Sequence, residues 1–491
     1  MKKVFLIRFF EILPGALTWS AIILPIIFTF IAPIPVIIFI LLFDLYWVYK
    51  SIIMGLHLFS GYQKMKKQLL IDWSKKLAEL PRQNLLHAVI FTTYKESIDI
   101  VEPSVESIVN AHTSGDRIIL VLATEDRDKE NAKILVKHLK DKYQKHFFDF
   151  IVTSHKLALG EMAGKGANAT WAAEILSKII RDKKIKPEQV IVTTADADTR
   201  FHQEYFNCLS YYFIITSDRT RCSFQPIPIY SNNIWHATVI ARILAFGSSF
   251  WQIIESTRPW RLINFSTHSM CLKTLEDMDY WNCQVVNEDS RQFWRAYYRL
   301  GGHHRVVPLF LPVYMDAVMG KNIKDTIKNQ YQQRLRWAYG IEHAPFILSQ
   351  TFTRNNIRFW DKFTKAFRFL ENNFSWATAS IFIAIVGWLP LLMSPDVNQT
   401  ILVFNVRVYA TRLLGFAWVG LMVSAIISMK LLPPRPKNFH PIKSFYMLAQ
   451  WILIPIVAIL FSSIPAIDAQ TRLMLGRYMG FRVTDKRQVK S

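Results

Sequence analysis

The chain has 491 residues, of which 51% are hydrophobic, and its 59 lysines and arginines outnumber its 37 aspartates and glutamates for a net charge of +22. A soluble nucleic-acid-binding protein can be this basic, but it rarely carries 35 Phe, 15 Trp and apolar runs long enough to cross a bilayer. The composition therefore excludes the nucleic-acid-binding class and indicates a membrane protein of two or three domains. Its four cysteines form no CxxC pair, and they suit reduced packing residues better than disulfides or a zinc site.

Two apolar segments open the chain, "LPGALTWSAIILPIIFTFIAP" and "PVIIFILLFDLYWVYKSIIMGLHLF". A signal peptide is the alternative interpretation of the first segment, which follows two lysines and an arginine. No A-x-A-like cleavage site follows it, and the second segment begins at once. Residues 1–58 are therefore expected to form an uncleaved transmembrane hairpin.

Residues 59–350 contain no spanning run and alternate strand-like with helix-like segments, which indicates a soluble α/β domain. Residues 351–374 include "WDKFTKAFRFLENNF", in which five apolar side chains share one helical face flanked by lysines and an arginine: Trp360, Phe363, Phe367, Leu370 and Phe374. This pattern predicts a basic amphipathic helix in the bilayer interface. An amphipathic helix packed on the domain is the alternative.

Apolar runs resume over residues 375–466, which predicts a C-terminal transmembrane region. The N-terminus and the loop "PPRPKNFHPIK" are basic, whereas the loops "APIP" and "SPDVNQT" hold no lysine or arginine. The positive-inside rule therefore places the large domain in the cytoplasm, and the basic tail 467–491 with it. Two spans before the domain and three after it would leave the tail outside, so the last segment, broken by two prolines, is a candidate re-entrant or interfacial element.

Three strand-like segments in the central domain each end in polar residues: "LLHAVIFTTYKES", "RIILVLATEDRD" and "QVIVTTADADTR". Ligands of open α/β sheets gather at the carboxyl ends of strands, so these clusters predict one crevice. Asp196 and Asp198 lie two apart, and on an extended segment both carboxylates would face one Mg²⁺ or Mn²⁺ ion. A solvated loop is the alternative for a bare DxD. No dinucleotide-binding or phosphate-loop motif is present.

Two further segments carry candidate chemistry. "GEMAGKGANATWA" places Lys165 and Asn168 in a glycine-rich turn before a helix, where a phosphate or nucleotide can bind. "QVVNEDSRQFWRAYYRLG" places Glu288 and Asp289 in the first turn of an amphipathic helix. Plain capping of that turn is one interpretation, and a carboxylate acting as general base is the other.

The order of these motifs resembles that of the membrane-embedded family 2 glycosyltransferases, the group that includes cellulose and hyaluronan synthases. The chain carries in sequence "TYKE", "TEDR", "KGAN", "DAD", "NED" and "QRLRW", and its tail carries "FRVTDK", which is similar to a gating loop. The resemblance covers nearly the whole chain. It departs at Lys95, where asparagine is usual, at "TEDR", a poor copy of D-D-G-S, and at Asn287, where threonine is common.

The resemblance implies a cytoplasmic GT-A domain, a mixed α/β sheet flanked by helices that binds a nucleotide sugar, inserted between transmembrane helices. It implies these nucleotide-sugar-binding residues: Thr93, Tyr94, Glu96, Glu125, Lys165, Asp196, Gln333 and Arg336. It assigns the metal to Asp196 and Asp198, the acceptor to Trp337 and Glu288, and general-base catalysis to Asp289. It assigns the gating loop to Phe481, Val483, Thr484 and Lys486.

The expected function is inverting transfer from a nucleotide-diphosphate sugar, a UDP-sugar by analogy, to a growing polysaccharide at the cytoplasmic face of a bacterial plasma membrane. Single transfer to a lipid acceptor is the alternative within this class. A transporter with a regulatory domain is the alternative outside this class. It would place ionisable residues within the spans, and the first and last apolar runs hold none. An inactive scaffold is weakened by the intact DAD, Asp289 and QRLRW.

Overall fold

The computed structural model describes residues 2–113, 115–386, 415, 420, 422–437, 440 and 442–480. The chain divides into two compact units. The helical unit comprises Met1–Ser60, Thr238–Leu244 and Ile327–Met479. The sheet unit comprises Gly61–Ala237, Ala245–Thr326 and Gly480–Ser491.

The sheet unit is built on one eight-stranded sheet with the order β3-β2-β1-β4-β7-β6-β8-β5. Its strands are β1 (Leu86–Thr92), β2 (Ile118–Glu125), β3 (Asp149–His155), β4 (Val190–Asp196), β5 (Arg200–Phe201), β6 (Cys222–Tyr230), β7 (His268–Cys271) and β8 (Arg305–Met315). Strands β3, β2, β1 and β4 run parallel, and β7 is antiparallel to both of its neighbours. The sheet is therefore mixed.

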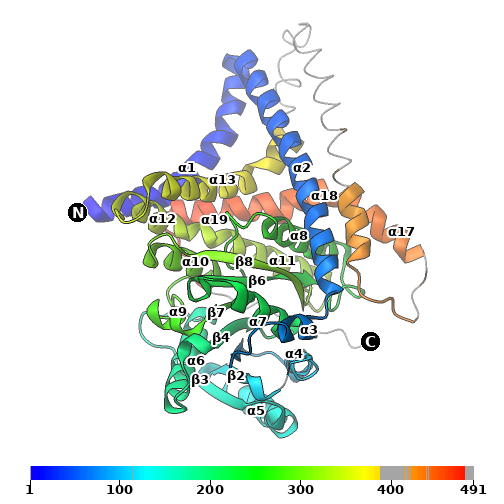
Figure 1. Ribbon diagram of the computed structural model, residues 1–491. Helices are drawn as coiled ribbons and strands as arrows, with labels where there is room; N and C mark the ends of the chain where they lie inside the picture. Colours follow the sequence, from blue (N-terminus) through cyan, green and yellow to red (C-terminus); the bar gives the residue numbers. More distant parts are fainter. Residues whose placement is uncertain are drawn as a thin grey trace. The chain divides into compact units, whose positions relative to one another are not determined.

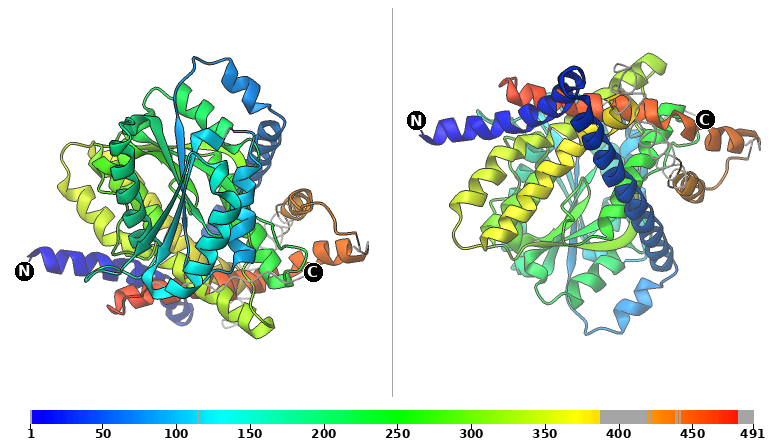
Figure 2. Two further views of the ribbon diagram at one scale, coloured as in Figure 1. Left: turned by 90° about the horizontal axis from the view of Figure 1, so that it is seen from below. Right: turned by 90° about the horizontal axis from the view of Figure 1, so that it is seen from above.

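Helices cover both faces of this sheet (Figure 1, Figure 2). They are α3 (Trp73–Ala78), α4 (Ile98–Val109), α5 (Lys129–Tyr143), α6 (Lys165–Asp182), α7 (Tyr205–Ile215), α9 (Leu272–Asp277) and α10 (Glu288–Arg299). Val89 and Phe91 of β1 pack in the core shared with α4, α5 and α7, whereas Ala88 and Ile90 pack in the core shared with α6 and α9. Because successive side chains of a strand point to opposite faces, a doubly covered strand is apolar throughout.

This architecture confirms the predicted fold class, a mixed α/β sheet flanked by helices and inserted in the sequence between apolar helices. The parallel register brings the carboxyl ends of four strands to one edge. Thr92 of β1 pairs with Asp196 of β4, and Glu125 of β2 pairs with His155 of β3. The polar residues that follow these strands therefore start from neighbouring positions.

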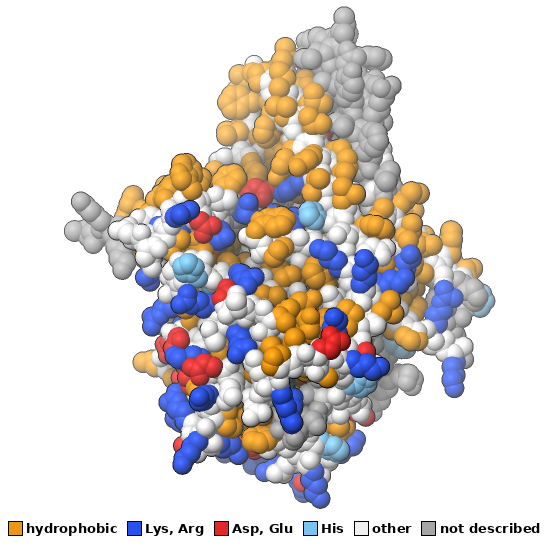
Figure 3. Space-filling model, viewed as in Figure 1, with side chains coloured by type: hydrophobic (Ala, Val, Ile, Leu, Met, Phe, Trp, Pro, Cys, Tyr) orange, Lys and Arg blue, Asp and Glu red, His pale blue; other side chains and the backbone are white. Residues whose placement is uncertain are grey.

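The helical unit contains α1 (Lys2–Ile31), α12 (Ala344–Thr353), α13 (Phe359–Ala384), α17 (Ile442–Ala449), α18 (Ile454–Ala458) and α19 (Ile464–Met474), with parts of α2 (Pro33–Leu69), α8 (Val239–Ser256) and α11 (Ile323–Ala338). Three helical stretches are long and apolar enough to cross a membrane, namely Val4–Ile31, Pro33–Leu69 and Ser444–Met474. Hydrophobic side chains cover the outside of α1 and α2 (Figure 3).

Polar contacts join the candidate spans within the helical unit. The Thr18 hydroxyl donates to the Gln470 Oε1 at 2.7 Å, and the Trp19 indole donates to the Thr471 hydroxyl at 2.9 Å. Both bonds tie α1 to α19. In α13, the aromatic side chains of Trp360, Phe363 and Phe367 are exposed, and the placement of this helix in the bilayer interface stays a prediction.

Candidate active site

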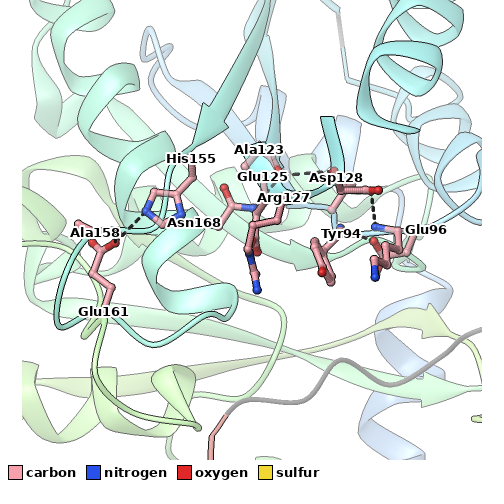
Figure 4. Close-up of polar contacts among 12 residues, drawn as sticks. Tyr94, Glu96, Ala123, Glu125, Arg127, Asp128, His155, Ala158, Glu161 and Asn168 are labelled. Atoms are coloured by element: carbon pink, nitrogen blue, oxygen red, sulfur yellow. Dashed lines mark hydrogen bonds and ion pairs between the residues drawn. The ribbon is translucent and has the colours of Figure 1, made fainter. Parts of the chain in front are cut away.

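The turn after β1 is held by carboxylates. The Tyr94 backbone N–H donates to Glu96 Oε2 at 2.5 Å, and the Lys95 N–H donates to Asp128 Oδ2 at 2.6 Å. Lys95 adopts a φ of 67°, a conformation that asparagine enters more easily than lysine. The Glu96 carboxylate therefore stabilises the turn, and the ring of Tyr94 extends from the turn (Figure 4).

The turn after β2 places the guanidinium of Arg127 beside the turn after β1. Arg127 forms an ion pair with the buried Glu125, with Nε 2.8 Å from Glu125 Oε2. The guanidinium also lies over the Tyr94 ring, 4.5 Å from its centroid. Glu125, predicted to bind the nucleotide, therefore orients Arg127, and Arg127 stacks on Tyr94.

A single backbone carbonyl, that of Ala123, collects donors from two motifs. It accepts the Thr93 N–H at 2.9 Å and the Asn168 side-chain amide at 2.9 Å. These bonds tie the turn after β1 and the first turns of α6 to β2. Farther along the same edge, the His155 Nε2 lies 3.0 Å from Glu161 Oε2, in the loop that leads to α6 (Figure 4).

Lys165, Asp196 and Ser266 form a closed ring of contacts. The Lys165 ammonium lies 2.7 Å from Asp196 Oδ1 and donates to the Ser266 carbonyl at 3.0 Å, while the Ser266 hydroxyl donates to Asp196 Oδ2 at 2.6 Å. Burial alone lowers the pKa of Lys165, but the negative charges of Asp196 and Glu288 outweigh that effect and raise it. A lysine that stays charged beside a carboxylate suits the binding of a diphosphate.

The first turn of α10 packs against the first turn of α6. A Cβ on Gly166 would lie 3.0 Å from the Cβ of Glu288, so glycine permits this close approach. Glu288 is buried, whereas Asp289 is partly exposed and accepts the Ser290 N–H at 2.6 Å. Burial and the charge of Asp289 raise the pKa of Glu288 to about 7, against the attraction of Lys165.

The prediction that Asp196 and Asp198 lie on one extended segment, with both carboxylates facing one metal ion, is wrong in its geometry. Strand β4 ends at Asp196, and the chain turns there, with the Thr199 N–H donating to the Asp196 carbonyl at 3.0 Å. Asp198 is only 2% exposed, and its Oδ2 accepts the Asp316 N–H at 3.0 Å. The two carboxylates therefore occupy different environments, and the assignment of both to one metal stays a prediction.

The donors around Asp196 nevertheless fit a hard divalent cation. Carboxylate, hydroxyl and carbonyl oxygens of Asp196 and Ser266 lie together, and the Lys165 ammonium beside Asp196 Oδ1 shows that this carboxylate attracts a positively charged partner. Mg²⁺ and Mn²⁺ prefer such oxygen ligands and complete their shells with water and substrate phosphates. In the part of the chain that the structure describes, no three His, Cys, Asp or Glu side chains gather as a metal cluster.

The "QRLRW" segment is helical and lies in the part of α11 that belongs to the helical unit. Gln333 is buried, and Arg336 and Trp337 are partly exposed. The side chain of Arg334, which the sequence analysis did not single out, lies 4.7 Å from the Trp337 ring centroid and donates to the Leu244 carbonyl at 2.7 Å. The predicted gating-loop residues 481–486 lie outside the described residues.

Sequence reasoning also missed Ser266 and Arg127. Ser266 is separated from Asp196 by 70 positions, and no spacing rule connects them. The segment "NFSTHSM" gives one weak signal, because it sets polar residues at the start of the buried strand β7. Arg127 follows the acidic "TED", where an arginine is an obvious ion-pair partner.

The fold and these residues define a class of protein: an α/β enzyme with a polar, cation-compatible site at the carboxyl ends of parallel strands. The sequence profile of glycosyl transferase family group 2 matches residues 191–462, which is more than half of the chain. The protein belongs to this family.

Solved structures add similarity at low identity. A mannosyltransferase from Pyrobaculum calidifontis, in complex with GDP-Man and Mn²⁺, shows 13% identity and a TM-score of 0.38, over 87% of this chain and 100% of its own. A fragment of TarS from S. aureus, in complex with UDP-GlcNAc, shows 12% identity and a TM-score of 0.38, over 82% of this chain and 95% of its own. A search of curated proteins finds no match.

Proposed function

We propose that the protein is an inverting, metal-dependent glycosyltransferase that moves a sugar from a UDP-sugar to a growing polysaccharide at the cytoplasmic face of a bacterial plasma membrane. The observation that carries the proposal is the meeting of Lys165, Asp196 and the first turn of α10 at the carboxyl ends of parallel strands. The reaction must stabilise the negative charge of the leaving diphosphate and remove the proton of the acceptor hydroxyl. This arrangement supplies Lys165 for the first task and a carboxylate of α10 for the second.

The donor side is formed by the turns after β1, β2 and β4. The Tyr94 ring, backed by Arg127, offers a flat surface for a nucleotide base. Lys165 supplies positive charge for the diphosphate. A Mg²⁺ or Mn²⁺ ion held by Asp196, with Asp198 as the second candidate ligand, would supply further stabilisation of the leaving diphosphate.

In the transfer step, the Asp289 carboxylate takes the proton of the acceptor hydroxyl. The oxygen of that hydroxyl bonds to the anomeric carbon, and the bond from that carbon to the diphosphate oxygen breaks. The nucleoside diphosphate leaves with the electron pair, so one displacement inverts the configuration. Asp289 suits this role better than its neighbour because it is partly exposed, whereas Glu288 is buried.

The proposal is completed by three residues of α11. Gln333 and Arg336 face the diphosphate, and Trp337 faces the acceptor sugar. Their helical spacing supports this assignment, because positions i, i+3 and i+4 share one face. An indole ring suits stacking on a sugar, and a guanidinium suits a diphosphate oxygen. Trp337 is held from one side by Arg334, which supports a fixed orientation of its ring.

The membrane location is supported by the three candidate spans and by α13. Trp360 is 73% exposed and Phe367 is 59% exposed, which water alone would disfavour. With the lysines beside them, these side chains suit the lipid interface.

Nucleoside-diphosphate release by the purified full-length protein in lipid tests the proposal. We would offer UDP-glucose, UDP-N-acetylglucosamine, UDP-glucuronate and GDP-mannose with Mg²⁺ or Mn²⁺, beside Asp289→Asn. Release with one donor that the variant lacks is expected. Sizing of the product then separates polymer from a singly glycosylated lipid, the second candidate. Equal release by the wild type and Asp289→Asn would contradict the assignment of the base.

A further inference from the structure

The hydroxyl of Ser266 is one member of the ring of contacts formed with Lys165 and Asp196. Lys165 approaches Asp196 at Oδ1, and Ser266 donates to Oδ2 at 2.6 Å. A hydrogen bond to a carboxylate is charge-assisted and shorter than a neutral one, and it fixes the plane of the group. The orientation of Asp196 thus depends on a residue from a distant loop.

That loop is itself held by a buried side chain. Gln225 of β6 is fully buried, and its Oε1 accepts the Phe265 N–H at 3.0 Å while its Nε2 donates to the Thr267 carbonyl at 2.9 Å. One amide therefore holds the backbone of both residues that neighbour Ser266 in the chain. Gln225 sits at the β-bulge where the pairing of β6 with β8 shifts register, and bulges commonly redirect a side chain.

We propose that Ser266 is the positioning residue of the cation site: its hydrogen bond to Oδ2 fixes the plane in which the Asp196 carboxylate is presented to a divalent cation. The inference rests on the proposed function, because it takes Asp196 as a metal ligand. In the ligand-free protein, the Lys165 ammonium lies 2.7 Å from Asp196 Oδ1, so this carboxylate already has a positively charged partner. Ser266 also accepts a bond from Lys165 through its carbonyl, so the same residue sets the distance between the ammonium and the carboxylate.

The test is the affinity of the full-length protein for Mn²⁺, alone and with UDP, measured from the electron paramagnetic resonance signal of free Mn²⁺. We expect Ser266→Ala to weaken Mn²⁺ binding about tenfold, since loss of a partner that orients a metal ligand commonly costs 10- to 100-fold in affinity. Ser266→Thr keeps the hydroxyl and should restore most of the loss.

Ser269→Ala is the matched control. Its hydroxyl, on the buried strand β7, lies 2.7 Å from the Thr193 hydroxyl and 3.1 Å from the Tyr205 hydroxyl, with no part in the ring. Its removal should lower the melting temperature without changing Mn²⁺ affinity. Wild-type affinity in Ser266→Ala, or an equal loss in Ser269→Ala, would overturn the inference.

Asp196→Asn separates this inference from the proposed function. If Asp196→Asn loses Mn²⁺ and Ser266→Ala does not, the cation site stands and the role of Ser266 is refuted. If Asp196→Asn binds Mn²⁺ as the wild type does, the cation lies elsewhere and the proposed assignment of the metal fails first.

Discussion

Replacement of Glu288 by glutamine should stabilise the protein, and by an amount that grows with pH. Glu288 is buried at the start of α10, and its pKa rises from 4.5 to about 7 on folding, through burial and the charge of Asp289. A raised carboxyl pKa means that the folded state prefers the proton. The stability contribution is therefore complete below the unfolded pKa and is lost as the pH rises through the folded pKa.

The magnitude follows from that difference in pKa. At about 1.36 kcal/mol for each pKa unit, the wild type loses about 3 kcal/mol between acid and mildly alkaline pH through this one group. Glutamine is neutral throughout and escapes the loss. The variant should match the wild type near pH 4.5, the unfolded value, and exceed it by about 3 kcal/mol near pH 8.5, or about 6 °C in Tm for a domain of this size.

The assay is thermal unfolding in lipid nanodiscs at both pH values, with EDTA present to keep cations away from the site. Glu130→Gln serves as the control because the Glu130 side chain is 84% exposed and pairs only at the surface with Lys133. Its Tm difference should stay near zero at both values. A Glu288→Gln difference that is the same at acid and alkaline pH would refute the reasoning.

Three smaller predictions concern the helical unit and the cysteines. Arg334→Met removes the bond to the Leu244 carbonyl and the contact with Trp337, so it should cost about 2 kcal/mol of stability; an unchanged Tm would count against these contacts. Tyr331→Phe removes the hydrogen bond, 3.1 Å long, to Asp468 Oδ2 and should cost about 1 kcal/mol, measured by denaturant unfolding against wild type. All four cysteines are free, so dithiothreitol should leave the Tm unchanged, and a lowered Tm would reveal a disulfide.

The strands and their polar ends could be predicted because the parallel strands are buried on both faces. Their apolar runs are continuous and end abruptly, as at Phe91 before "TTYKE" and at Ala195 before Asp196. The helix that begins at Glu288 was equally clear, since its aromatic side chains recur at helical spacing and are buried.

Other features depend on contacts that no local pattern records. The turn at Asp196 lacks a glycine or proline to mark it, so an extended segment was assumed. The bond from Ser266 to Asp196 joins residues far apart in the chain, and Gln225, from strand β6, holds the backbone on either side of Ser266. Arg334 was passed over because its partner carbonyl belongs to α8.

The convergence of Thr93 and Asn168 on the Ala123 carbonyl has a consequence for the evolution of this site. A carbonyl is present whatever the side chain, so these bonds place no demand on the identity of residue 123 beyond its small volume. The turn after β1 is thereby anchored at Thr93 through a backbone N–H, whereas the start of α6 depends on the side-chain amide of Asn168. Libraries that vary the side chain at position 93 should therefore retain folding more often than libraries that vary position 168.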